Sequence, residues 1–105
     1  MGKTRIQKQI GIFTQRVKTK IPNARLILFG SYVKGEANQY SDIDILVISD
    51  TFLKMKQKKR FDMLYSMAKG IYPDINAFGF TPDEVVKINP LTTLSDALKT
   101  GQVIS

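Results

Sequence analysis

One short segment constrains the fold more than any other, residues 41–48, with the sequence Ser-Asp-Ile-Asp-Ile-Leu-Val-Ile. Polar and apolar residues alternate at its beginning, and it ends in a continuous apolar run. On an extended strand this alternation places Asp42 and Asp44 on one face and Ile43 on the other. An apolar run on both faces is typical of a strand at the centre of a sheet. The segment therefore predicts a central strand whose beginning is exposed at a cleft.

Helices are predicted before the first strand and after the central strand in the sequence. Near the amino terminus apolar residues recur every three or four positions, which indicates an amphipathic helix that must end by Pro22. Its apolar stripe consists of Ile6, Ile10, Phe13, Val17 and Ile21. A second helix is expected from about residue 51 to 69, capped by the turn at 49–51, and its lysine-rich beginning is alternatively a loop. Its apolar face consists of Phe61, Leu64, Tyr65 and Ala68.

Two more strands are expected, one on each side of the central one in the sequence. The apolar run Leu26–Phe29 predicts a strand buried on both faces, and residues 74–80 predict a strand with Ile75 and Ala77 on one face. After this strand, Thr81-Pro82-Asp83-Glu84 is a helix start of the capping-box type, and the helix should end near Asn89-Pro90. The tail has helical spacing at Leu94, Ala97 and Leu98, a stop at Gly101, and then Val103-Ile104.

These elements together indicate an α+β (α/β) fold, with a small mixed sheet of at least three strands flanked by helices. A chain of 105 residues has room for one hydrophobic core, so we expect a single domain over residues 1–105. Hydrophobic residues make up 43% and charged residues 24%, which is the composition of a globular protein.

The composition excludes several kinds of chemistry. The chain has no cysteine and no histidine, which removes disulfides, zinc sites built on thiolate or imidazole, and triads based on histidine. No apolar run approaches the roughly 20 residues of a membrane span, and there is no signal-peptide core, so we expect no membrane contact and a cytoplasmic location. The net charge of +7 attracts polyanions in general, which favours nucleotides but does not by itself favour direct nucleic-acid binding.

Asp42 and Asp44 are the strongest candidates for a chemical role. Two carboxylates side by side repel each other unless a cation lies between them. A hard divalent ion such as Mg²⁺ takes carboxylate oxygens and keeps positions free for water and substrate phosphates. An isolated Asp-x-Asp also occurs as a strand-entry turn, so the pair is informative only together with its surroundings. Asp50 and Asp83 are better explained as helix-start residues and Asp62 as a solvated helix position.

The turn before this strand supplies the second part of the candidate site. Gly30-Ser31 follows the strand Leu26–Phe29 directly, where glycine permits a tight turn and Ser31 can cap the helical turn that follows. Backbone amides at such a turn form a recurring anion site, although a Gly-Ser dipeptide alone is usually an ordinary turn. Lys34 is a further candidate contact for phosphate.

The combination is more informative than its parts. Gly30-Ser31, ten residues and then Asp42-x-Asp44 resembles the signature of the DNA polymerase β-like nucleotidyltransferase superfamily, and the short chain looks like its minimal nucleotidyltransferase branch. The resemblance covers roughly residues 26–81. Members carry a third carboxylate on a neighbouring strand, and Asp74 in Pro-Asp-Ile-Asn-Ala-Phe is its expected counterpart here.

The resemblance implies a metal-dependent reaction. Asp42, Asp44 and Asp74 would be catalytic and would hold two Mg²⁺ ions, while Gly30, Ser31 and Lys34 would bind the phosphates of ATP as nucleotide donor. Nucleotidyl transfer needs the phosphates held in line and their developing charge neutralised, which agrees with this set of residues.

The resemblance also implies a partner. Members of the minimal branch often act as the antitoxin beside a HEPN toxin, and a chain this short leaves no residues for an acceptor-binding domain. We therefore expect transfer of AMP to a hydroxyl of a HEPN-type helical toxin protein. Two alternatives remain open. The chain could block its partner by contact alone, through an apolar surface formed by Leu94, Leu98, Val103 and Ile104, or it could modify a small molecule together with a second subunit. The sequence leaves both homo- and hetero-oligomers open.

Overall fold

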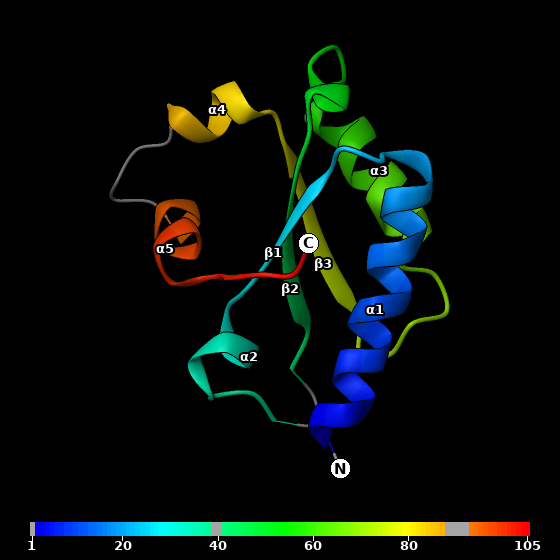
Figure 1. Cartoon of the computed structure of the whole chain (residues 1–105), viewed down its shortest axis with the longest axis vertical. Coiled ribbons are helices and arrows are strands. Elements are labelled where there is room, and N and C mark those ends of the chain that lie inside the picture. Colours follow the sequence, from blue (N-terminus) through cyan, green and yellow to red (C-terminus); the bar gives the residue numbers. More distant parts are fainter. Residues whose placement is uncertain (1, 39–40, 88–92) are drawn as a thin grey trace.

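The computed structural model describes residues 2–38, 41–87 and 93–105. Its strands form one sheet in the order β3-β2-β1-β4 (Figure 1). Their bounds are Arg25–Phe29 (β1), Ile43–Ile48 (β2), Ile75–Phe80 (β3) and Gln102–Val103 (β4). The central strand β2 pairs antiparallel with β1 and parallel with β3, so the sheet is mixed, as predicted.

The helices flank this sheet on both sides. Their bounds are Gly2–Lys20 (α1), Ser31–Lys34 (α2), Gln57–Met67 (α3), Pro82–Val86 (α4) and Thr93–Thr100 (α5), with a short 3-10 helix at Asp50–Phe52 (η1). Figure 1 shows α1 and α3 on one side of the sheet and α5 on the other. The predicted α+β architecture is therefore confirmed. Among the described residues, no helix is long and apolar enough to cross a bilayer.

The hydrophobic core lies between the sheet and the layer of α1 and α3. The predicted stripe is confirmed, because Ile10, Phe13 and Val17 of α1 are buried, Ile21 directly after the helix is buried as well, and Ile6 packs against them. From the sheet the core receives one face of each long strand: Leu26 and Leu28, Ile43, Ile45 and Val47, and Ile75 and Ala77. The helix ends at Lys20, two residues before Pro22, as the missing N–H of proline requires.

The predicted buried face of α3 is only half correct. Leu64 and Ala68 are buried, but Phe61 is 47% and Tyr65 67% exposed, and their rings stack on the surface. Arg60 points into the protein instead. The helix begins at Gln57, so the alternative of a non-helical, lysine-rich beginning is the correct one for residues 53–56.

Arg60 is buried because its guanidinium group is fully used. Its Nη1 donates to Glu84 Oε1 at 2.6 Å and to the carbonyl of Gly79 at 3.2 Å, and its Nε donates to the carbonyl of Met55 at 2.9 Å. The group also lies 5.7 Å from the ring centre of Phe52. Glu84 in turn completes the predicted capping box with Thr81. One arginine therefore joins α3, β3 and α4.

The fourth strand was not predicted. The tail forms helix α5 and stops at Gly101 as expected, but Gln102 and Val103 then pair antiparallel with β1. The N–H of Leu26 donates to the carbonyl of Ser105 at 3.1 Å, and the N–H of Ile104 donates to the carbonyl of Leu26 at 2.8 Å. The predicted helix end at Asn89-Pro90 and the side chains of Leu94 and Ala97 lie outside the described residues.

Candidate active site at the start of β2

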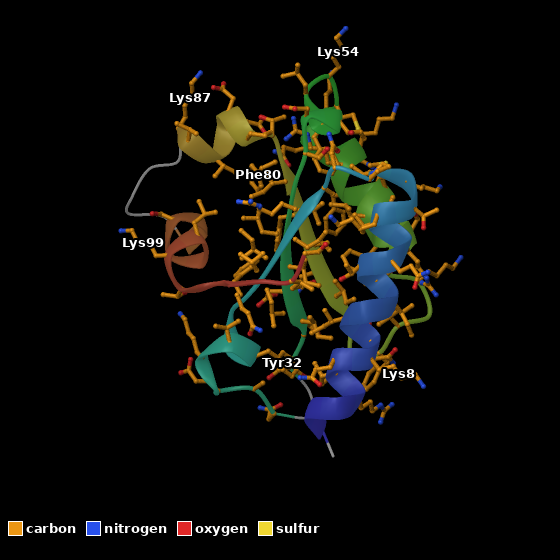
Figure 2. All side chains as sticks on the ribbon, viewed as in Figure 1. Lys8, Tyr32, Lys54, Phe80, Lys87 and Lys99 are labelled. Atoms are coloured by element: carbon orange, nitrogen blue, oxygen red, sulfur yellow. The ribbon has the colours of Figure 1, made fainter. Side chains whose placement is uncertain are left out.

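The two aspartates lie where strand β2 begins. Asp42 is exposed just before the strand, and Asp44 is its second residue and is partly buried. Ile43 and Ile45 are fully buried against the core layer, so both carboxylates project from the opposite face, as the alternation predicted. Figure 2 shows Phe80 of β3 projecting from the sheet away from α1, on this same second face.

Gly30 and Asp44 lie in direct contact. Phe29, the last residue of β1, pairs with Asp44, so the turn after β1 passes beside the carboxylate. A Cβ atom at Gly30 would overlap Asp44 Oδ2 and would lie 3.2 Å from its Cγ. Gly30 also has φ +79° and ψ −151°, a conformation essentially restricted to glycine. The glycine therefore brings bare backbone against a carboxylate.

Ser31 begins the short helix α2 and does not cap it. The N-cap is Gly30, whose carbonyl accepts from the N–H groups of Val33 and Lys34, each at 3.1 Å, and no side chain caps this helix. The first N–H groups of a helix have no partner within it, and this helix begins directly after Gly30, which lies against Asp44. Lys34 lies exposed at the other end of α2.

Asn76 is the residue that the sequence analysis missed. It pairs with Asp44 in the parallel register of β2 and β3. Its Nδ2 donates to Asp42 Oδ2 at 3.2 Å and to Asp44 Oδ1 at 3.3 Å, so one amide bridges both carboxylates. The signal was present in the sequence: Asp74-Ile-Asn76 on β3 repeats the spacing of Asp42-Ile-Asp44 on β2.

Asp74 does not join this cluster. It precedes β3 level with Asp42, its side chain is exposed, and its carbonyl accepts from the N–H of Ile43 at 2.8 Å. In the part of the chain that the structure describes, no three acidic side chains are grouped closely enough to hold a metal ion together. The hydrogen-bonded cluster in the structure consists of two carboxylates and an amide.

The surroundings raise the pKa of two side chains at this site, Asp44 and Tyr32. Burial raises the pKa of Asp44, the neighbouring charge of Asp42 raises it further, and the hydrogen bond from Asn76 opposes the rise. Burial also raises the pKa of Tyr32, with contributions from Tyr72 and Asp42. Tyr32 donates to the carbonyl of Ser41 at 3.2 Å and lies between α2 and the start of β2 (Figure 2).

The donors present here fit a hard divalent cation. Carboxylate and amide oxygens are the ligands that Mg²⁺ and Mn²⁺ prefer, and the site has no soft donor. The bare backbone at Gly30 lets the Asp44 carboxylate lie directly against it, in a place that a side chain at residue 30 would occupy. Figure 2 shows Lys8, Lys54, Lys87 and Lys99 at widely separated points of the molecule.

The chain is similar to known proteins over most of its length. The family model of the nucleotidyltransferase domain matches residues 8–97. A curated protein of Methanocaldococcus jannaschii, named "Putative protein adenylyltransferase", is 44% identical over 52 residues, which are 48% of this chain and 33% of the relative. The match thus spans about a third of that protein. The crystal structure of a putative nucleotidyltransferase from Sulfolobus solfataricus superimposes with a TM-score of 0.63 at 23% identity, covering 98% of this chain and 87% of the other. That likeness shows the same fold.

Proposed function

This chain belongs to the nucleotidyltransferase domain family, and we propose that it transfers AMP from ATP to a hydroxyl group on a partner protein. The observation that carries the proposal is the contact between Gly30 and Asp44, because it sets a turn with bare backbone beside a pair of carboxylates. Nucleotidyl transfer needs a cradle for the phosphates and negative ligands for the accompanying cation. The name of the Methanocaldococcus jannaschii relative supports AMP as the group transferred and a protein as the acceptor.

Each residue of the site has a role in this proposal. Asp42 and Asp44 would hold the divalent cation, which would supply positive charge opposite the phosphates. The backbone N–H groups at Gly30 and Ser31 would hold the β- and γ-phosphates. Lys34 is a further candidate contact for the phosphates.

The sheet order suggests the direction from which the acceptor approaches. In-line displacement places the attacking hydroxyl opposite the leaving pyrophosphate. Gly30 follows β1 on one side of Asp44, and Asn76 on β3 lies on the other side. With the phosphates held at Gly30, the acceptor therefore approaches over β3.

Exposed aromatic side chains near β3 support a protein as acceptor. Phe78 is 41% exposed, and its ring lies 6.2 Å from that of Phe29, which pairs with Asp44. Beside it is a hollow of about 290 Å³, lined by Gln57, Lys58, Phe61, Ala77, Phe78 and Gly79. Aromatic residues in such a hollow are typical anchors for a protein partner.

We further propose that this partner is a HEPN-type helical toxin, which the added AMP would silence in the cytoplasm. The support is the resemblance of Gly30-Ser31 and Asp42-x-Asp44 to the minimal nucleotidyltransferases. A tyrosine hydroxyl is the proposed acceptor.

Labelled nucleotide tests the proposal directly. The purified chain is incubated with ATP labelled in the α-phosphate, Mg²⁺ and a candidate HEPN toxin, beginning with the product of the adjacent gene. Label should appear on the toxin, and Asp44→Asn should reduce the rate at least about 100-fold. Asp83→Asn, an exposed aspartate paired with Lys87 on α4, is the matched control and should keep the rate. A folded pair of proteins that transfers no label contradicts the proposal.

A second candidate function is inhibition by contact alone. The exposed Phe61, Tyr65 and Phe78 favour it, because they offer a binding surface that needs no chemistry. Of the tail residues considered for this surface, Val103 is 60% exposed, whereas Ile104 packs against the core. The combined change Asp42→Asn, Asp44→Asn and Asp74→Asn distinguishes the two functions. If this variant still neutralises the toxin, contact inhibition is the function.

A further inference from the structure

We propose that Asn76, and not Asp74, is the third ligand of the cation beside Asp42 and Asp44. Without nucleotide, the site then has one negative charge fewer than a site of three carboxylates. This inference rests on the proposed function, because it concerns the cation that nucleotidyl transfer requires. It assigns to Asn76 a role that the family signature gives to a carboxylate.

The position of Asn76 supports the first part. In the parallel register it lies directly opposite Asp44, and its Nδ2 is within 3.3 Å of an oxygen from each aspartate. The partly positive NH₂ group therefore stabilises two carboxylates that would otherwise repel each other. The other end of the same amide is a carbonyl oxygen, which is a good ligand for a hard cation. A half-turn of the amide exchanges the two ends.

The position of Asp74 supports its exclusion from the ligands of the cation. Its carboxylate is exposed, and the hydrogen bond of Asp74 to β2 is made by its backbone carbonyl. No group of three acidic side chains that could hold a metal exists within residues 2–38, 41–87 and 93–105. Asp74 thus lies beside the site, just before β3, and its side chain is not one of the hydrogen-bonded groups of the cluster.

A site with two carboxylates instead of three affects the order in which the cation and the nucleotide bind. Affinity for hard cations rises with the number of charged ligands, so two carboxylates and an amide bind more weakly than three carboxylates. Nucleotide phosphates can supply the remaining negative ligands. We infer that the domain alone binds its cation weakly and acquires it together with the nucleotide, with each tightening the binding of the other by the same factor.

Titration with Mn²⁺ in the absence of nucleotide, followed by electron paramagnetic resonance, tests this inference. Asn76→Asp should lower the Kd for Mn²⁺ at least about tenfold, because it adds a charge in contact with the ion. Asn76→Ala should raise the Kd several-fold, and Asp74→Asn should leave it within about twofold. The variant with both Asp42→Asn and Asp44→Asn gives the background from other carboxylates.

Thermal unfolding provides an independent measurement and a check on folding. Without metal, Asn76→Asp should lower Tm, because three carboxylates then meet without a bridging NH₂ group. Added Mn²⁺ should raise Tm more in this variant than in the unchanged chain, since tighter binding stabilises the folded state more. The inference is overturned if Asp74→Asn weakens Mn²⁺ binding as much as Asn76→Ala does, or if Asn76→Asp gains no affinity.

The failure of this inference differs from the failure of the proposed function. If label is transferred to the toxin but Asp74 proves to be the third ligand, only the inference is wrong. If Mn²⁺ binding follows the expected order but no label is transferred to any acceptor, the assignment of the ligands stands and the proposed reaction is wrong.

Discussion

Gly30 has two separate reasons to be glycine. A Cβ atom would overlap the Asp44 carboxylate, and the backbone has a conformation that other residues rarely adopt. Gly35, at the other end of α2, has φ +74° but no atom within 4 Å of its missing Cβ. A comparison of substitutions at the two glycines therefore distinguishes the effect of backbone strain from the effect of the close contact with Asp44.

We predict that Gly30→Ala lowers the free energy of unfolding by about 1–3 kcal/mol and abolishes nucleotide transfer. Gly35→Ala should cost about 1 kcal/mol and leave transfer largely intact. Urea unfolding and the labelling assay measure both effects. The cost of Gly30→Ala should shrink in an Asp44→Ala background, where the overlapping carboxylate is absent; an unchanged cost would show that strain alone is responsible.

We expect the ionised carboxylate of Asp44 to serve nucleotide transfer while it lowers the free energy of unfolding. Its pKa is raised mainly by burial, so the folded protein binds this proton more tightly than the unfolded chain does. The stability contributed by the protonated carboxyl is present at low pH and is lost as pH rises from the ordinary pKa through the raised one.

We predict that Asp44→Asn removes this dependence, raises Tm at pH 7 in the presence of EDTA, and abolishes transfer. Circular dichroism melting from pH 3.5 to 7 measures it, with Asp83→Asn as the exposed control. A lower Tm at pH 7 for Asp44→Asn would show that Asp44 contributes to stability through its bonds and not only to the site.

Among the elements, α3 shows how one long-range partner decides which side chains are buried. Arg60 is 4% exposed because Glu84, Gly79 and Met55 satisfy its donors. Phe61, the next residue, is displaced toward solvent. Spacing alone favours the aromatic residue inside, so the observed face depends on a partner 24 residues away.

We predict that Glu84→Gln lowers the free energy of unfolding at pH 7 by about 1–2 kcal/mol. The hydrogen bond from Arg60 and those from Thr81 hold the pKa of Glu84 below its usual range. Its stabilisation is therefore present above the ordinary pKa and is lost as pH falls through the lowered one. Chemical unfolding at pH 7 and pH 3.5 measures the difference. Asp83→Asn breaks an exposed pair on the same helix and should cost less than about 0.5 kcal/mol.

Two apolar residues on α3 provide a further prediction. Leu64 is fully buried, so Leu64→Ala should cost about 2–5 kcal/mol. Phe61 is nearly half exposed, so Phe61→Ala should cost less than about 1 kcal/mol despite removing a larger side chain. Urea unfolding measures both. Equal losses would contradict the exposed position of Phe61.

At the scale of the whole molecule, β4 closes one edge of the sheet. The tail returns across the molecule and lies along β1, where the backbone of Leu26 bonds to Ile104 and Ser105. An unpaired β1 would present free N–H and C=O groups at an edge, which promotes association between chains.

We predict that deleting residues 102–105 lowers Tm by several degrees and promotes dimers or larger assemblies. The N–H of Leu26 should then exchange with solvent much faster, because its acceptor at Ser105 is lost. Hydrogen exchange and size-exclusion chromatography measure both effects. Unchanged protection of Leu26 would show that β4 contributes little to the closure of this edge.

The sequence by itself determined the elements that are recognisable from neighbouring residues alone. The spacing along α1, the apolar runs of β1 and β2, the alternation at Asp42 and Asp44 and the capping box at Thr81 depend only on neighbouring residues. The faces of a strand and a helix follow from backbone geometry, so these predictions needed no knowledge of the fold.

Only the tertiary structure decided which partners meet. The parallel register of β2 and β3 brings Asn76 opposite Asp44, where its amide bonds to both aspartates, while Asp74 of the same segment bonds to β2 through its backbone carbonyl. The burial of Arg60 and the pairing of β4 with β1 likewise depend on residues far apart in the chain. Periodicity determines the face on which a side chain lies, but contacts across the sheet depend on register and packing, which no local pattern contains.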